Sequence, residues 1–190
     1  ADASDVFARI TRRPGTIYTA LVPNLQGLER AADAGLEEIA IFAAASESFS
    51  RANLNQGIDD AFRTYAAVCE RASALGMRVR GYLSTAFGCP YEGNVAVARV
   101  AELSGRLLEM GVYQVAVSDT IGVAHPGQVA QVLEVVGERV PLDAVALHFH
   151  DTSGTALANA LTALSLGITT FDASAGGLGI LIPPSIVMVM

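Results

Sequence analysis

The sequence predicts an α/β fold of the (β/α)₈ TIM-barrel type, with about six of the eight βα units present. Three features lead to this prediction. Short β-rich runs alternate with longer helical patterns, glycines separate helical patterns from the strands that follow them, and polar residues gather where the predicted strands end. Such alternation is typical of parallel strands that are connected by helical crossovers.

Each predicted strand is a short run of mostly apolar residues, bounded by polar or turn-forming residues. In chain order these runs are Ile17–Val22, Glu38–Ala43, Arg78–Leu83, Gln114–Ser118, Ala144–His148 and Thr169–Ser174. The predicted helices lie between the strands and place apolar residues at three- and four-residue spacing. They are Leu25–Ala34, Ile58–Leu75, Val95–Met110, Gly127–Arg139 and Thr155–Leu166.

Glycine marks the joins between helices and strands. Gly35, Gly76, Gly111 and Gly167 each lie at the end of a helical pattern, just before the next strand. Glycine is common there because it adopts the left-handed backbone conformation without a penalty from Cβ. The recurrence of this join supports a chain of βα units.

Two architectures fit this order of elements. A doubly wound open sheet of five or six strands suits the length, whereas a complete (β/α)₈ barrel usually needs about 250 residues. The polar residues favour the barrel, because they follow almost every strand. A barrel gathers all of its strand ends around one mouth, whereas an open sheet uses only those beside its switch point.

Composition narrows the classes of partner. A net charge of −7 disfavours nucleic acid, and no apolar run reaches the roughly 20 residues of a membrane span, so we expect a soluble protein without a membrane partner. The N-terminal segment lacks the layout of a secretory signal. Two cysteines cannot build a disulfide framework, which favours a reducing compartment.

All twelve basic residues are arginine. Without lysine, the chain has no side chain that could form a Schiff base with a carbonyl substrate, anchor pyridoxal phosphate or serve a P-loop. Chemistry beside a carbonyl group would therefore need another electrophile. A metal ion is the obvious candidate.

Two motifs at strand ends carry candidate chemical groups. His148 and His150 flank Phe149, so both imidazoles point to one side of a strand and can bind one cation together. A histidine pair without a ligand is the open alternative. Asp119 follows an apolar run and can act as a general base or hydrogen-bond acceptor, or it can hold the loop as an N-cap or turn residue.

Two loops carry weaker signals. Cys89 lies in a turn-forming loop with no activating neighbour in sequence, which favours a structural cysteine over a nucleophile. The glycine-rich stretch from Gly176 to Gly179 is weak evidence for phosphate binding or mobility.

Several motifs resemble those of the 3-hydroxy-3-methylglutaryl-CoA (HMG-CoA) lyase family, in the same order from about residue 5 to residue 179. They are Leu21–Gly27, Phe42–Glu47, Ala86–Gly93, Ser118–Gly122, His148–Thr152 with Gly154 and Ala156–Asn159, and Ser174–Gly179. The resemblance implies a (β/α)₈ barrel, a divalent cation (Mg²⁺ or Mn²⁺) and an acyl-CoA substrate. The implied reaction cleaves HMG-CoA to acetyl-CoA and acetoacetate, in leucine degradation or ketone-body formation.

The resemblance also implies roles for individual residues. By position in the family motifs, His148 and His150 are metal ligands, and Asp119 is a catalytic residue near the reacting centre. The residues that line the substrate pocket are Asn24, Arg80 and Tyr82.

The chain departs from the family pattern at both ends. Family members begin with a strand carrying an Arg-Asp-Gly motif, about two βα units earlier. Leu181 stands where the family has its catalytic cysteine, and Met190 where it has a metal-binding asparagine. We therefore expect a partial lyase-type barrel domain over residues 1–179, an apolar non-family tail over residues 180–190, and little or no activity of the chain alone. With oxygen ligands missing, Zn²⁺, Co²⁺ or Ni²⁺ should bind better than Mg²⁺.

Other functions and locations stay open. The chain can be a non-catalytic remnant that binds a partner through its tail and open sheet edges, or a related metal-dependent aldolase or condensing enzyme. The loop from Gly88 to Gly93 favours the CoA lyase over the latter. A homo-oligomer is possible. The arginine-only, alanine-rich composition favours the bacterial cytoplasm, with the mitochondrial matrix as the alternative.

Overall fold

The computed structural model describes residues 3–172 and 187–189, and it confirms the parallel βα architecture. Seven strands form one sheet in the order β6-β5-β4-β3-β2-β1-β7, and all pairings are parallel. The strands are β1 (Thr19–Leu21), β2 (Glu38–Ala44), β3 (Arg78–Ser84), β4 (Gln114–Asp119), β5 (Val145–Phe149), β6 (Thr170–Asp172) and β7 (Val187–Val189).

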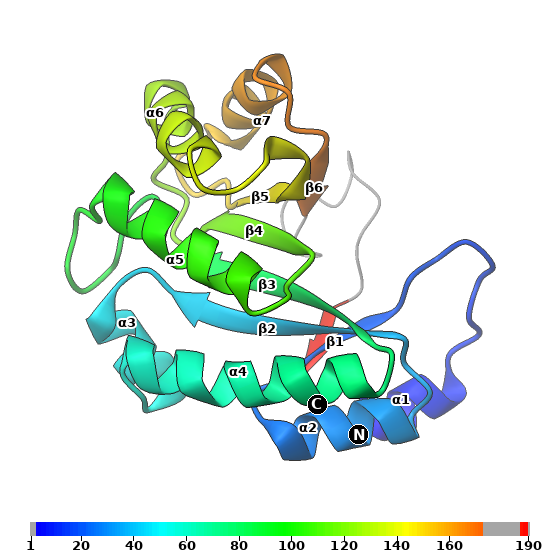
Figure 1. Cartoon of the computed structure of the whole chain (residues 1–190). Coiled ribbons are helices and arrows are strands. Elements are labelled where there is room, and N and C mark those ends of the chain that lie inside the picture. Colours follow the sequence, from blue (N-terminus) through cyan, green and yellow to red (C-terminus); the bar gives the residue numbers. More distant parts are fainter. Residues whose placement is uncertain (1–2, 173–186, 190) are drawn as a thin grey trace.

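The helices cover the outer side of this sheet, and consecutive helices α5, α6 and α7 pack side by side (Figure 1). The helical elements are α1 (Ala3–Arg9), α2 (Leu25–Asp33), α3 (Glu47–Leu54), α4 (Ile58–Ala74), α5 (Val97–Glu109), α6 (Pro126–Gly137), the 3₁₀ turn η1 (Leu142–Ala144) and α7 (Ala156–Ser165). None of the helices in the described ranges is both long and apolar enough to cross a membrane.

The structure adds four elements that the sequence patterns did not predict: α1, α3, η1 and β7. β7 falls in the segment expected to be a non-family tail, where residues 187–189 pair with β1. Of the predicted strand Thr169–Ser174, Thr170–Asp172 form β6. The last two residues of that prediction and the glycine-rich stretch after them lie outside the described residues. The domain boundary at residue 179 stays a prediction.

The sheet is strongly curved. Arg80 on β3 and Asp172 on β6 form an ion pair at 2.8 Å, although β4 and β5 lie between their strands. In a flat sheet, strands three positions apart would lie about 14 Å from one another, and side chains perpendicular to the sheet could not meet. The contact requires a sheet curled into part of a barrel, and this agrees with the partial TIM barrel that the sequence predicts.

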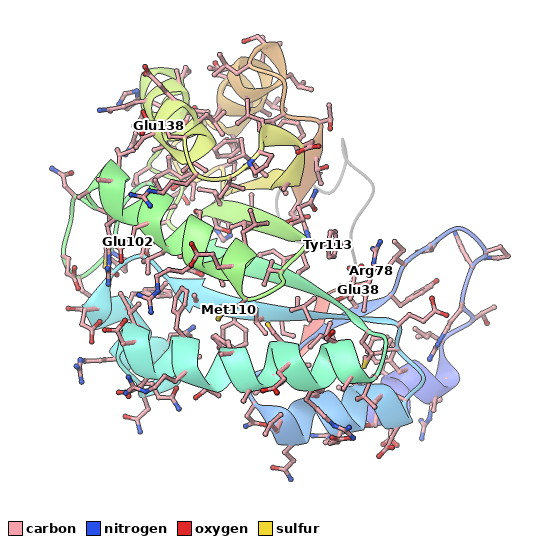
Figure 2. All side chains as sticks on the ribbon, viewed as in Figure 1. Glu38, Arg78, Glu102, Met110, Tyr113 and Glu138 are labelled. Carbon is pink, nitrogen blue, oxygen red and sulfur yellow. The ribbon has the colours of Figure 1, made fainter. Side chains whose placement is uncertain are left out.

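The hydrophobic core lies between the sheet and the helices, and side chains fill this space (Figure 2). A Cβ atom built on Gly81 of β3 would contact Val112 and the α5 residue Leu107, so this side of the strand faces the helices. Side chains alternate along a strand, so Arg80 and Tyr82 face the concave side. The fully buried helix-facing strand residues include Ile39, Ile41, Leu83, Val115, Val117 and Leu147.

Candidate functional site

Polar side chains from several strands meet on the concave face. Strand pairing aligns Ser118 of β4 with His148 of β5, and His148 with Asp172 of β6. Aligned residues of neighbouring strands project to the same side of a sheet. These residues lie at or near the carboxyl ends of their strands, where a parallel barrel places its site.

The two candidate metal ligands lie together at the end of β5. The ring centroids of His148 and His150 are 4.9 Å apart, in an edge-to-face arrangement. Burial, and then the neighbouring His150, lower the pKa of His148, which favours the neutral imidazole that binds metals. His148 therefore presents a nitrogen donor beside the ring of His150.

The fit of this pair to a divalent cation is partial. Within the described ranges, no group of three or more His, Cys, Asp or Glu side chains is arranged to hold a metal ion. Two imidazoles supply two of the four or more ligands that a protein-bound divalent cation takes. Residues beyond the described part, water or substrate would have to complete the coordination.

Arg80 and Tyr82 form the floor of the concave face. Arg80 is buried, with Nε donating to Gln114 Oε1 at 2.9 Å and Nη1 donating to Tyr82 Oη and Asp172 Oδ1, both at 2.8 Å. Burial lowers the pKa of Arg80, but the charge of Asp172 raises it and the net direction is upward. Burial, and then Asp172, raise the pKa of Tyr82 to about 12. Both groups stay protonated.

Sequence reasoning gave no role to Gln114 or Asp172, which hold Arg80 from β4 and β6. Asp172 lies in the predicted strand Thr169–Ser174, but its partner Arg80 is 92 positions away in the chain. Only strand alternation offered a signal, since Gln114 and Asp172 both lie on the face opposite the apolar core. The pairing itself required the tertiary structure.

The structure places Asp119 away from the concave face. It pairs with Phe149 on the helix-facing side of the sheet and is fully buried. Its two carboxylate oxygens accept hydrogen bonds from the backbone N–H groups of Val123 and Ala124, at 3.1 and 3.0 Å. These bonds match the loop-holding alternative raised from the sequence, and the catalytic role of Asp119 stays a prediction.

Asn24 is exposed and caps helix α2. Its Oδ1 accepts a hydrogen bond from the backbone N–H of Gly27 at 3.0 Å, in the usual N-cap geometry. Asn24 follows β1, so it lies at the same end of the sheet as the histidines. Its hydrogen bond serves the helix, and its contact with substrate stays a prediction.

Cys89 has a structural environment. Its Sγ accepts hydrogen bonds from the Ser46 hydroxyl at 3.0 Å and from the backbone N–H groups of Tyr91 and Glu92, both at 3.4 Å. Ser46 also bonds Thr85, a buried residue with a φ of +58°. These contacts tie the loops after β2 and β3 together at the rim of the concave face.

Comparisons with known proteins agree with this geometry. The HMGL-like family model matches residues 2–180. The mitochondrial hydroxymethylglutaryl-CoA lyase of Mus musculus is 47% identical over 179 residues, which are 94% of this chain and 55% of the mouse protein.

Solved structures of relatives have the same fold. The hydroxymethylglutaryl-CoA lyase of Pseudomonas aeruginosa superposes with a TM-score of 0.89 at 47% identity, over 92% of this chain and 58% of that one. An HMG-CoA lyase of Acinetobacter baumannii in complex with coenzyme A and 3-methylmalate has a TM-score of 0.87 at 34% identity, over 93% and 58%. The chain thus spans little more than half the length of these relatives.

Proposed function

We propose the following function for this chain, which belongs to the HMGL-like family. The chain carries the acyl-CoA-binding floor and two metal ligands of a lyase that cleaves HMG-CoA to acetyl-CoA and acetoacetate. The observation that carries this proposal is the meeting of the His148–His150 pair with the Arg80–Tyr82 floor on one concave face. The A. baumannii relative, in complex with coenzyme A and 3-methylmalate, supports an acyl-CoA as the substrate class.

His148 and His150 would hold the divalent cation of this lyase family. When bound, such a cation stabilises negative charge on substrate oxygens. The chain has no lysine that could perform this task instead. The pair itself supplies only nitrogen donors, so Zn²⁺, Co²⁺ and Ni²⁺ suit it better than Mg²⁺.

The chain's own residues bind and orient the acyl group in this proposal. Arg80 is a fixed cation and Tyr82 a protonated hydroxyl at neutral pH, so both can donate hydrogen bonds to substrate oxygens. Asn24 contacts substrate at the rim. Asp119 acts near the reacting centre by holding the loop after β4 in place, through its hydrogen bonds to the backbone of Val123 and Ala124.

Calorimetric titration of the 190-residue chain with HMG-CoA in the presence of Mn²⁺ tests the proposal. We expect saturable binding that Tyr82→Phe weakens, because the hydroxyl is removed while the ring is kept. Acetoacetate release should stay near background, since catalytic groups act as a unit and the described residues supply only part of a metal site. Absence of binding, or binding unchanged in Tyr82→Phe, would overturn it.

We also propose a cellular location and an oligomeric state for the protein. Relatives occur in mitochondria and in bacteria, and we propose a bacterial cytoplasmic protein because the arginine-only composition is typical of GC-rich bacterial genomes. A homo-oligomer stays a prediction for size-exclusion chromatography with light scattering to test.

A further inference from the structure

The buried ion pair between Arg80 and Asp172 is the feature of the concave face whose role is least explained. Each side chain is 7% exposed, and the pair links β3 to β6 across the hollow of the sheet. The function proposed above uses Arg80 but gives Asp172 no task.

The Arg80–Asp172 pair should contribute little to the stability of the fold. Arg80 Nη2 and Asp172 Oδ2 are both buried without a hydrogen-bond partner within the described ranges. Removing two charges from water generally costs as much free energy as their attraction returns, and each unsatisfied atom adds to that cost. An apolar pair of similar volume would suit a barrel interior at least as well, so the value of this pair lies elsewhere than in stability.

The position of Asp172 suggests what it contributes. It contacts Arg80, which in turn donates to Tyr82, and it pairs in the sheet with His148. Asp172 therefore lies between the floor that faces the acyl group and the histidine pair. The Arg80 guanidinium donates to the Asp172 carboxylate on one side and to Gln114 on the other. These two contacts fix the plane of the guanidinium, because its donors point in fixed directions.

We propose that Asp172 is a positioning residue of the substrate site: through Arg80 it fixes the guanidinium and the Tyr82 hydroxyl in the orientation that receives an oxygen atom of the acyl group. The proposal rests on the proposed function for its substrate. Its central step, the orientation of Arg80, can be measured without any substrate.

The test uses the 190-residue chain, its Asp172→Asn variant and an Asp60→Asn control, which breaks an exposed pair with Arg63. Nuclear magnetic resonance relaxation of the twelve arginine Nε–H groups reports their mobility. We expect Arg80 Nε–H to be rigid in the unaltered chain and in the control, and mobile in Asp172→Asn. Loss of an oriented, charge-assisted contact should also weaken HMG-CoA binding about tenfold or more in Asp172→Asn alone.

A double variant, Arg80→Met with Asp172→Leu, separates positioning from stability. We expect it to unfold at or above the temperature of the unaltered chain while losing HMG-CoA binding. A rigid Arg80 in Asp172→Asn, or normal binding by the double variant, would overturn the inference. If the unaltered chain binds no HMG-CoA, the proposed function fails, and the mobility of Arg80 still decides whether Asp172 orients it.

Discussion

Among the glycines that the structure describes, Gly122 combines a positive φ with the closest approach of a neighbouring backbone atom. Its φ is +67°, and a Cβ atom built on it would lie 2.6 Å from Oγ1 and 2.7 Å from the backbone N of Thr152. Gly122→Ala should lower the free energy of unfolding by about 3 kcal/mol or more, because it adds a backbone clash to an unfavourable conformation. Urea denaturation monitored by circular dichroism measures the change.

Gly154→Ala is the matched control for this prediction. Gly154 has a similar φ of +72°, but nothing lies within 4 Å of the place that a Cβ atom would occupy. Its substitution should cost only about 1–2 kcal/mol, which is the cost of the left-handed conformation alone. Equal losses in the two variants would contradict the close approach of the loops after β4 and β5.

Cys69 should show a pH-dependent contribution to stability. It is buried on α4, and burial raises its pKa from 9.0 to about 11. A raised pKa means that the stabilising contribution is complete below pH 9 and is lost as the pH rises through 11. We expect the folded chain to react slowly with iodoacetamide at pH 8 and the urea-unfolded chain to react rapidly.

Peptide mapping by mass spectrometry assigns the iodoacetamide label to Cys69 or Cys89. Comparable rates for Cys69 in the folded and unfolded chain would contradict its burial. Cys89 is buried as well, so its peptide should also be labelled slowly in the folded chain and rapidly in the unfolded chain.

At the scale of elements, the N-terminus of α2 gives a direct test of a cap. Asn24→Ala should lower the free energy of unfolding by about 1 kcal/mol, because the hydrogen bond to Gly27 is lost. Asn24→Asp should retain the stability, since a carboxylate caps equally well and complements the helix dipole. Thermal unfolding of the three chains decides the matter, and equal melting of all three would show that the cap contributes nothing.

The joins between elements could be predicted from the sequence because their causes are local. Gly35, Gly76, Gly111 and Gly167 all adopt positive φ after helices, as their positions indicated. Helix α3 was missed because it has only eight residues, most of them polar, and therefore shows little apolar periodicity. β7 was missed because a three-residue apolar run carries no signal of its pairing with β1.

Side-chain direction was predictable where strand alternation decides it, and less so at strand ends. The shared face of His148 and His150 follows from their spacing alone. Asp119 is the last residue of β4, and its carboxylate turns to the backbone of the loop rather than to the concave face. A polar residue at a strand end thus has two uses, and only the tertiary structure distinguishes them.

At the scale of the whole molecule, curvature of the sheet creates the site. The Arg80–Asp172 contact joins strands that are three positions apart and residues 92 positions apart in the chain. No local pattern encodes such a contact, which is why the floor of the concave face was only partly predicted. The barrel class could be predicted, because polar residues follow almost every predicted strand and a barrel brings all of its strand ends to one mouth.

We expect the histidine pair at the end of β5 to bind a metal ion on this concave face. Calorimetric titration with Co²⁺ at about pH 7.5, where imidazole is largely neutral, tests it most directly. The proteins compared are the unaltered chain, His148→Ala, His150→Ala and a His125→Asn control that retains the cap of α6. Either alanine variant should lose Co²⁺ binding, the control should retain it, and Mg²⁺ should bind more weakly than Co²⁺. Equal Co²⁺ affinity in all four proteins would show that the histidine pair does not bind the ion.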